Sequence, residues 1–369
     1  MPNGNLGGGT GTQTNPFQVW DVADLNALRG KPTSATNRTY IRLKADIDFR
    51  GSANERHFPT LRFGNDTAVA NSWDFIDIDG EGHTIRNFRQ IGNDANACGF
   101  FSTLDGSIRN LSFVNVDLVI TDRAIHAGVL GRNIRGGPVE NIVVSGSVFS
   151  VNSVAGLINT LTTINNTTPF IVSGCQVGLV ARCEGSFSGF NFSTNLSSIV
   201  EYRNCISTST VYSASASANL GGFVGNTSGQ NRFFNCISAC RFIMITAAGQ
   251  FTGTVAGYRA TTNSITYSFR NCISMCLFDG LPPSTVNNMA AFAPNSLTTA
   301  NTVECYSICR YNLRTSTANI RGGDGVIIFD WQNSGLPLSR FNDGATVGVT
   351  TAQLQSRAFL QARGWVFAS

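Results

Sequence analysis

Three carboxylates stand close together near residue 80, in the segment IDIDGEG that begins at Ile76. Asp77 and Asp79 alternate along a run of β-type composition, so they share one strand face, and Glu81 follows in a Gly-rich turn. Carboxylates grouped in this way can chelate calcium, or can supply the acid and the base of glycan hydrolysis. The DGEG segment is also a turn signal. We favour the structural role and predict no catalytic residue, no metal and no cofactor.

The ten cysteines are the second set of residues that could do chemistry. A row of cysteines can bind metal, but a linear row cannot surround zinc tetrahedrally, and Cβ atoms stacked about 4.8 Å apart exceed the separation that a disulfide prefers. We therefore predict buried free thiols that act as small hydrophobes, which fits synthesis in a reducing compartment. The row consists of Cys175, Cys205, Cys236, Cys272 and Cys305, and Cys240, Cys276 and Cys309 follow three of these by four residues.

Charge, hydropathy and histidine spacing exclude several function classes. The net charge is +4 and the basic residues are scattered, so a nucleic-acid partner is not expected. No run of 18 apolar residues occurs, which argues against membrane insertion, and the N-terminal residues carry no recognisable export signal. His57, His83 and His126 are isolated, and no Ser-His-Asp or Cys-His spacing stands out.

An internal repeat organises the chain. Short segments with an apolar-polar-Asn-apolar pattern recur about every 31 residues, and a series of Gly-hydrophobic segments interleaves with them. Two markers that keep the same period predict a solenoid. The glycines, from Gly99 to Gly222, are expected at corners that turn sharply or need positive φ. The Asn positions are expected to stack as a ladder of hydrogen-bonded amides, made of Asn87, Asn110, Asn141, Asn204, Asn235 and Asn271.

Each repeat holds several short β-type runs and no helical periodicity, so we predict an all-β, right-handed parallel β-helix. A propeller blade would need about 40 to 45 residues. Short helices are expected to cap both ends: one at DVADLNALR, with Asp21 as N-cap and Trp20, Val22, Leu25 and Leu28 over the first coil, and one after Thr351. The predicted organisation is an arm and capping helix at 1–38, β-helix repeats at 39–330 and a C-terminal cap at 331–369.

The chain resembles right-handed β-helical surface proteins with GLUG-type repeats. The resemblance is carried by the lead-in with NPF and DLNALR, by IDIDGEGHTIRNF from Ile76 to Phe88, by the Gly and Asn steps, and by RGWVF at Arg363 to Phe367. Members are adhesive or surface modules, and similar β-helices occur in viral fibres and spikes. The resemblance implies an architecture and assigns no catalytic residue.

Three functions follow as hypotheses. The first is a non-enzymatic structural or receptor-binding protein of a virion, such as a phage fibre, spike or decoration protein. It would be assembled in the host cytoplasm against other virion proteins or against itself, as in a homotrimer, with a cell-surface glycan as a further partner. The second is a secreted bacterial adhesin at the cell surface. The third is a tailspike-like polysaccharide lyase or hydrolase that uses Asp77 and Asp79.

Overall fold

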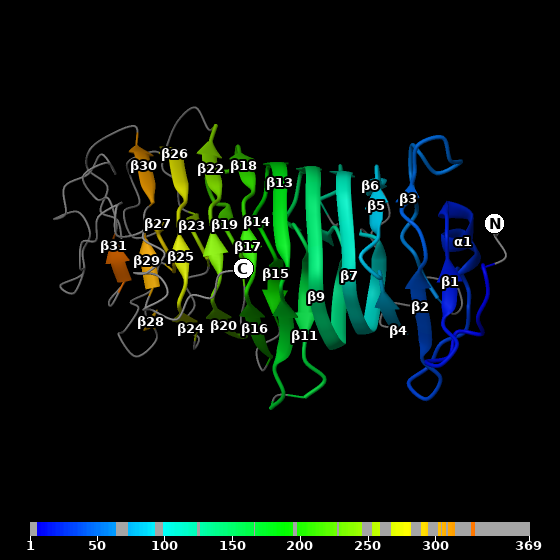
Figure 1. Cartoon of the computed structure of the whole chain (residues 1–369). Coiled ribbons are helices and arrows are strands. Elements are labelled where there is room, and N and C mark those ends of the chain that lie inside the picture. The colour runs from blue at the N-terminus through cyan, green and yellow to red at the C-terminus, as the bar shows by residue number, and fades with distance from the viewer. Residues whose placement is uncertain are drawn as a thin grey trace.

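The structure is a computed structural model of the 369-residue chain. It describes residues 6–63, 73–92, 99–123, 126–165, 167–194, 198–226, 229–245, 253–258, 267–281, 289–293, 302–303, 305–307, 309–313 and 326–328. The fold is the predicted parallel β-solenoid. Every pairing between named strands in these ranges is parallel, and each joins a strand to its equivalent about 30 residues away. Figure 1 shows the strands side by side along a rod, from the N-terminal end to the C-terminal end.

Three kinds of strand form the larger sheet, one after another around each coil. The first kind precedes a corner and comprises β1 (Phe17–Val19), β2 (Thr39–Leu43), β4 (Asp74–Asp79), β12 (Phe170–Ser173), β16 (Ile199–Arg203), β20 (Gln230–Phe234), β24 (Tyr267–Arg270) and β28 (Thr302–Val303). The second kind is short and follows that corner: β3 (Ile47–Asp48), β5 (Thr84–Arg86), β17 (Ile206–Ser207), β21 (Ile237–Ser238), β25 (Ile273–Ser274), β29 (Cys305–Ser307) and β31 (Val326–Ile328). The third kind comes next: β6 (Arg89–Gly92), β13 (Gln176–Cys183), β18 (Thr210–Ser213), β22 (Arg241–Met244), β26 (Leu277–Leu281) and β30 (Arg310–Leu313).

The remaining strands close the coil. A second sheet contains β8 (Ala127–Gly128), β10 (Val154–Ala155), β14 (Phe187–Ser188), β19 (Asn219–Gly221), β23 (Thr254–Ala256) and β27 (Met289–Ala290). In the larger sheet, β11 (Ile158–Thr162) and β15 (Asn191–Thr194) pair with each other. Two long strands, β7 (Phe101–Ile120) and β9 (Gly131–Ser150), continue through the corners that separate the shorter strands elsewhere.

The core is a column of side chains that repeats with the coils. Ring centroids of Phe190 and Phe223 lie 4.6 Å apart, those of Phe223 and Tyr258 4.8 Å, and those of Tyr258 and Phe292 4.9 Å. These separations equal the spacing between paired strands, because each ring lies above its equivalent in the preceding coil. The rings therefore tie coil to coil along the axis.

Helix α1 (Val22–Ala27) covers the N-terminal end of the core. Asp21 is its N-cap, since its carboxylate accepts a hydrogen bond from the Asp24 N–H at 2.9 Å, and Leu25 and Leu28 are buried. Val22 is buried as well, whereas Trp20 keeps 37% of its surface exposed. The predicted helix after Thr351 lies outside the described residues.

The glycine column stands where coils approach most closely. A Cβ on Gly222 would lie 1.8 Å from the carbonyl oxygen of Gly257, and one on Gly189 would lie 1.9 Å from that of Gly222. Gly99 has φ +134, but Gly156, Gly189, Gly222 and Gly257 do not have positive φ. The expectation of corners is therefore confirmed for Gly156, Gly189 and Gly222, which lie at bends directly after β10, β14 and β19, but positive φ is not what requires glycine there. These glycines are needed because the backbone of the next coil occupies the space of a side chain.

Candidate functional site

A corner with left-handed backbone carries most of the predicted Asn ladder. Asn110, Asn141, Asn204, Asn235 and Asn271 all have φ between 52° and 55°. Their side chains bond along the column: the Asn141 amide donates to Asn110 at 3.0 Å, Asn235 to Asn204 at 3.1 Å, and Asn271 to Asn235 at 3.2 Å. Asn is one of the few residues that tolerates this backbone conformation, and its amide can both donate and accept. The ladder therefore holds successive corners in register.

Two positions depart from the predicted ladder. Asn87 lies at a different corner, where it donates to Asp48 at 2.6 Å and accepts from Asn115 at 2.6 Å, so grouping it with Asn110 was wrong. Gly174 occupies the main column with φ +61, and a Cβ there would lie 2.3 Å from the Asn141 side-chain oxygen. The Asn141 amide thus fills the space that Gly174 leaves.

The cysteines lie inside the coil, next to the Asn corner. Cys205 and Cys236 are fully buried, and each thiol contacts two backbone carbonyl oxygens, at 3.3 and 3.4 Å. The Cys276 thiol lies 3.3 Å from the Ser238 hydroxyl oxygen and 3.6 Å from the Ser238 carbonyl oxygen. The free cysteines among the described residues are Cys175, Cys183, Cys205, Cys236, Cys240, Cys272, Cys276, Cys305 and Cys309. Burial raises the pKa of Cys183 to about 12, so this thiol is not a nucleophile at neutral pH.

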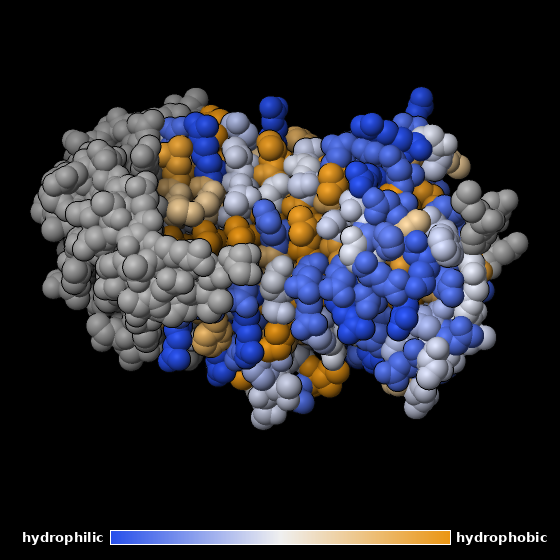
Figure 2. Space-filling model, viewed as in Figure 1, coloured by the Kyte–Doolittle hydropathy of each residue, from blue (hydrophilic) through white to orange (hydrophobic). Residues whose placement is uncertain are grey.

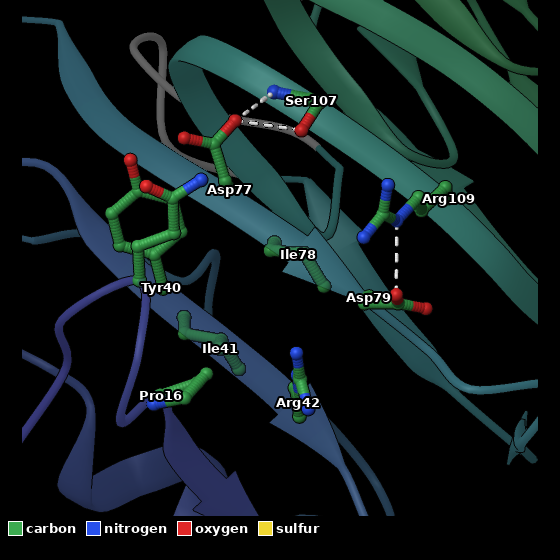
Figure 3. A pocket seen from close by; sticks show the side chains of 10 residues that line it. Pro16, Tyr40, Ile41, Arg42, Asp77, Ile78, Asp79, Ser107 and Arg109 are labelled. Atoms are coloured by element: carbon green, nitrogen blue, oxygen red, sulfur yellow. Dashed lines mark hydrogen bonds and ion pairs between the residues drawn. The ribbon is translucent and has the colours of Figure 1, made fainter. Parts of the chain in front are cut away.

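A pocket of about 310 Å³ contains the predicted carboxylates. It lies across β2, β4 and β7, and Figure 3 shows Tyr40, Asp77 and Arg109 facing a common space. The strand register explains the arrangement, because Tyr40 pairs with Asp77, Arg42 with Asp79, and Asp79 with Arg109. Two columns of outward polar side chains therefore form its wall. Within each column, neighbouring side chains are about 4.8 Å apart along the rod.

Asp77 is held as an ionised carboxylate. It accepts from the Arg38 Nε at 3.0 Å and from the Ser107 N–H and hydroxyl at 2.9 and 2.6 Å. Burial opposes ionisation, but the hydrogen bonds from Ser107 and the charge of Arg38 outweigh it and lower the pKa of Asp77. A carboxyl group in this state cannot act as a general acid near neutral pH.

Asp79 is ionised for similar reasons. It accepts from the Arg109 Nε at 2.9 Å, from the Asn110 amide at 3.1 Å and from the Glu81 N–H at 3.0 Å. These bonds and the Arg109 charge lower the pKa of Asp79 despite its partial burial. Glu81 turns away to Lys44, at 2.7 Å. Among the described residues, no three His, Cys, Asp or Glu side chains are grouped so that they could hold a metal ion.

The three histidines are dispersed. His57 accepts from the Ile91 N–H at 3.2 Å, His83 lies 3.4 Å from Asp46, and His126 stacks on Phe192 with ring centroids 6.1 Å apart. Burial lowers the pKa of His57 and His126, which favours their neutral forms. They do not form a common site.

A second recess of about 520 Å³ lies beside the turn between β11 and β12. Pro138, Ile164 and Pro169 give it a largely apolar wall, with Glu140 and Arg203 also lining it. The side chains that form the recess come from different coils, so no single stretch of the sequence marks it. This recess suits an apolar group more than acid-base chemistry.

Comparisons with known proteins found one similar structure and one similar sequence. No family model matches the chain, so the GLUG-type resemblance rests on its motifs alone. A solved structure from Bacteroides ovatus, described as a "putative immunoglobulin A1 protease", aligns with a TM-score of 0.51 at 20% identity, over 96% of this chain and 89% of that one. At this identity the match shows the fold only.

The second similarity is local. Over 160 residues, 41% of this chain, the sequence is 31% identical to halomucin of Haloquadratum walsbyi (strain DSM 16790 / HBSQ001). The matched segment is about 2% of halomucin. Within the described residues, the one helix is too short to cross a membrane.

Proposed function

We propose that this chain is a non-catalytic β-solenoid that serves as a binding module, with a glycan as the ligand of the pocket over β2, β4 and β7. The observation that carries the proposal is the state of Asp77 and Asp79. Both are bonded to arginines and both have lowered pKa values, so neither is placed to donate a proton.

The same pocket suits carbohydrate chemistry. Sugar hydroxyls both donate and accept, and the wall combines carboxylate acceptors with guanidinium donors. Arg109 uses its Nε for Asp79, and a guanidinium carries four further N–H donors. Tyr40 adds an aromatic ring and a hydroxyl at the same place (Figure 3). A repeating glycan could lie along the columns, since these columns follow the rod.

We favour a cell-surface or extracellular location over a virion. The similarity to a segment of halomucin supports a module that also occurs within a much longer polypeptide. Nothing in the comparisons supports the more specific hypothesis of a phage fibre, spike or decoration protein, which stays a hypothesis.

Glycan binding is tested with the full chain on a glycan array, followed by titration calorimetry of each hit. Tyr40→Ala and Arg109→Ala are expected to weaken binding at least about tenfold, since each removes a wall group. Phe192→Ala, on β15, and Arg123→Ala are controls away from the pocket and should leave affinity unchanged. Equal loss in all four variants, or no glycan hit on a broad array, would remove this pocket as the binding site.

An enzymatic function is the second candidate, because the protein of similar fold is described as a "putative immunoglobulin A1 protease". Incubation of the chain with immunoglobulin A1 and with other folded proteins tests it directly. Cleavage that is lost on a single substitution in this chain would replace the proposal above.

A further inference from the structure

One side of the rod presents two regular columns of outward side chains. Strands β6, β7, β9, β13, β18 and β22 pair in register there, and we call this surface the β13 face. The first column contains Arg89, Asp117, Ser147, Val180, Thr210 and Arg241. The second column contains Ile91, Val119, Phe149, Arg182, Tyr212 and Ile243.

The β13 face is more apolar than the N-terminal end of the rod. Ile91 is 37% exposed, Phe149 39% and Val180 49%, although all three are large hydrophobic side chains. Figure 2 shows hydrophilic residues gathered over the N-terminal strands, while hydrophobic patches lie farther along the rod. A flat sheet surface with several exposed apolar side chains in consecutive strands is typical of an interaction surface.

The order of residues makes this face complementary to itself. A two-fold axis parallel to β13 would reverse the order of the strands and place each column against the same column of a second copy. Strand β7 would then face β22, and β9 would face β18. Asp117 would meet Arg241 of the second copy, Val119 would meet Ile243, and Phe149 would meet Tyr212.

The alternative is a dimer in which the two rods run parallel, and it lacks this match. An axis along the rod would place the first column against the second, so that Asp117 would face Val119 and Arg241 would face Ile243. Neither charge would then gain an opposite charge from the second copy, and both would lose water to apolar side chains, which is unfavourable. The antiparallel arrangement is therefore the one that the sequence of each column supports.

Existing contacts are compatible with the antiparallel pair. Asp117 already accepts from the Arg89 Nε at 3.0 Å, and Arg241 lies 3.1 Å from Asp279. All four side chains keep some exposure, so a second copy can add a partner without breaking either pair. Arg182 would lie near the axis, but its guanidinium rests 5.7 Å from the centre of the Tyr212 ring, on the β18 side of β13.

We propose that this chain forms an antiparallel two-fold dimer through the β13 face, with Asp117 paired to Arg241 and Phe149 packed on Tyr212 of the second copy. The six strands span only about 25 Å along the rod, so the contact is smaller than that of most permanent dimers. The dimer is accordingly expected to dissociate on dilution.

Sedimentation equilibrium of the full chain, from about 1 to about 300 µM, tests the association. Phe149→Lys and Val180→Lys should raise the dimer dissociation constant at least about tenfold. Ile164→Lys is the matched control, because Ile164 is 65% exposed and lies between β11 and β12, off this face. A chain that stays monomeric throughout, or variants that all behave alike, would overturn the proposal.

Charge exchange tests the predicted pairing. Asp117→Arg should weaken the dimer because it places two arginines together, and the double variant Asp117→Arg/Arg241→Asp should recover most of the affinity. These substitutions also change the ion pairs of Asp117 with Arg89 and of Arg241 with Asp279 within one chain. Thermal melts followed by circular dichroism therefore check that each variant is folded. Failure of the double variant to recover, with all variants folded, would contradict the pairing.

Cross-linking tests whether the two rods of the dimer run antiparallel. Val180→Cys should form a disulfide with its own equivalent, because Val180 lies on the strand at the axis. Ser147→Cys should cross-link to Thr210→Cys when the two variants are mixed, and neither should cross-link alone. A Ser147→Cys variant that dimerises by itself would show a different arrangement and would refute the proposal.

Discussion

Asn235 donates a side-chain hydrogen bond to Asn204, its equivalent 31 residues earlier, at 3.1 Å, and both residues have left-handed backbone conformations. The contact joins two coils at the same corner. Since Asn271 donates to Asn235 in turn, at 3.2 Å, the bond is one step of a ladder. Backbone conformation and hydrogen bonding at this corner thus depend on one residue type.

Asn235→Ala should lower the free energy of unfolding by about 2 to 4 kcal/mol, because it adds the cost of positive φ to the loss of two amide bonds. Asn235→Gly keeps the backbone conformation and loses only the bonds, so its effect should be smaller, about 1 to 2 kcal/mol. Equilibrium urea denaturation gives both values. If the two variants lose the same free energy, the left-handed conformation contributes nothing to the choice of Asn.

Gly222→Ala should destabilise the solenoid by more than about 3 kcal/mol, since the new Cβ would lie 1.8 Å from the Gly257 carbonyl oxygen. Gly51→Ala is the control: Gly51 has φ +72, but a Cβ there would meet no atom within 4 Å, so only backbone strain is added, about 1 to 2 kcal/mol. Thermal melts of both variants measure the difference. A mild effect at Gly222 would mean that the coils can separate locally.

Asp74, at the start of β4, should make stability fall as pH rises. It is 7% exposed, and burial raises its pKa from 3.8 to about 7 although the Phe63 N–H and the Arg62 charge oppose this. The unfolded chain loses this proton near pH 4 and the folded chain near pH 7. The stabilising effect is therefore complete below pH 4 and disappears as pH approaches and passes 7.

Asp74→Asn should remove this dependence. The variant is expected to be more stable than the natural chain at pH 8, by up to about 4 kcal/mol, and the difference should vanish near pH 4. Urea denaturation at a series of pH values measures it. An unchanged pH profile would show that Asp74 is ionised in the folded protein at neutral pH.

The buried thiols should resist modification. We expect a thiol-specific disulfide reagent at pH 8 to leave the nine described cysteines unmodified in the folded protein, as mapped by peptide mass spectrometry, and to modify them in guanidinium chloride. Ile164→Cys supplies an exposed thiol as a positive control, because Ile164 is 65% exposed and lies off the β13 face. Rapid modification of Cys205 or Cys236 in the folded state would contradict their burial.

The fold was predictable because its determinants repeat. An Asn corner recurs in most coils, and Tyr202, Phe233 and Phe269 each precede one of these Asn residues by two positions, so the period was visible even though the coils differ in length. The grouping of Asn87 with Asn110 was wrong because the coil before Asn110 has no Asn at the equivalent corner. Gly80 and Glu81, directly after β4, form that corner, and φ of Glu81 is +50°. A local sequence pattern does not distinguish two corners of one coil.

The candidate site was predictable only in part. Asp77 and Asp79 stood out by spacing, but their partners Arg38, Ser107 and Arg109 are about 30 to 40 residues away, and only the register brings them together. The glycines were correctly assigned to corners, but local sequence shows only their conformational freedom and not the close approach of another coil. An alignment of the coils to one another on the Asn corner would have shown which residues form the two columns of the β13 face.

A product assay tests the central claim, that Asp77 and Asp79 position a binding surface and do not turn over a substrate. The full chain is incubated at pH 5 to 8 with each glycan that it binds, and released oligosaccharides are detected by mass spectrometry. We predict binding without product for the natural chain, and no product with Asp77→Asn or Asp79→Asn, which should bind more weakly because each loses a carboxylate of the pocket wall. Product that forms with the natural chain and is lost in either variant would contradict the account.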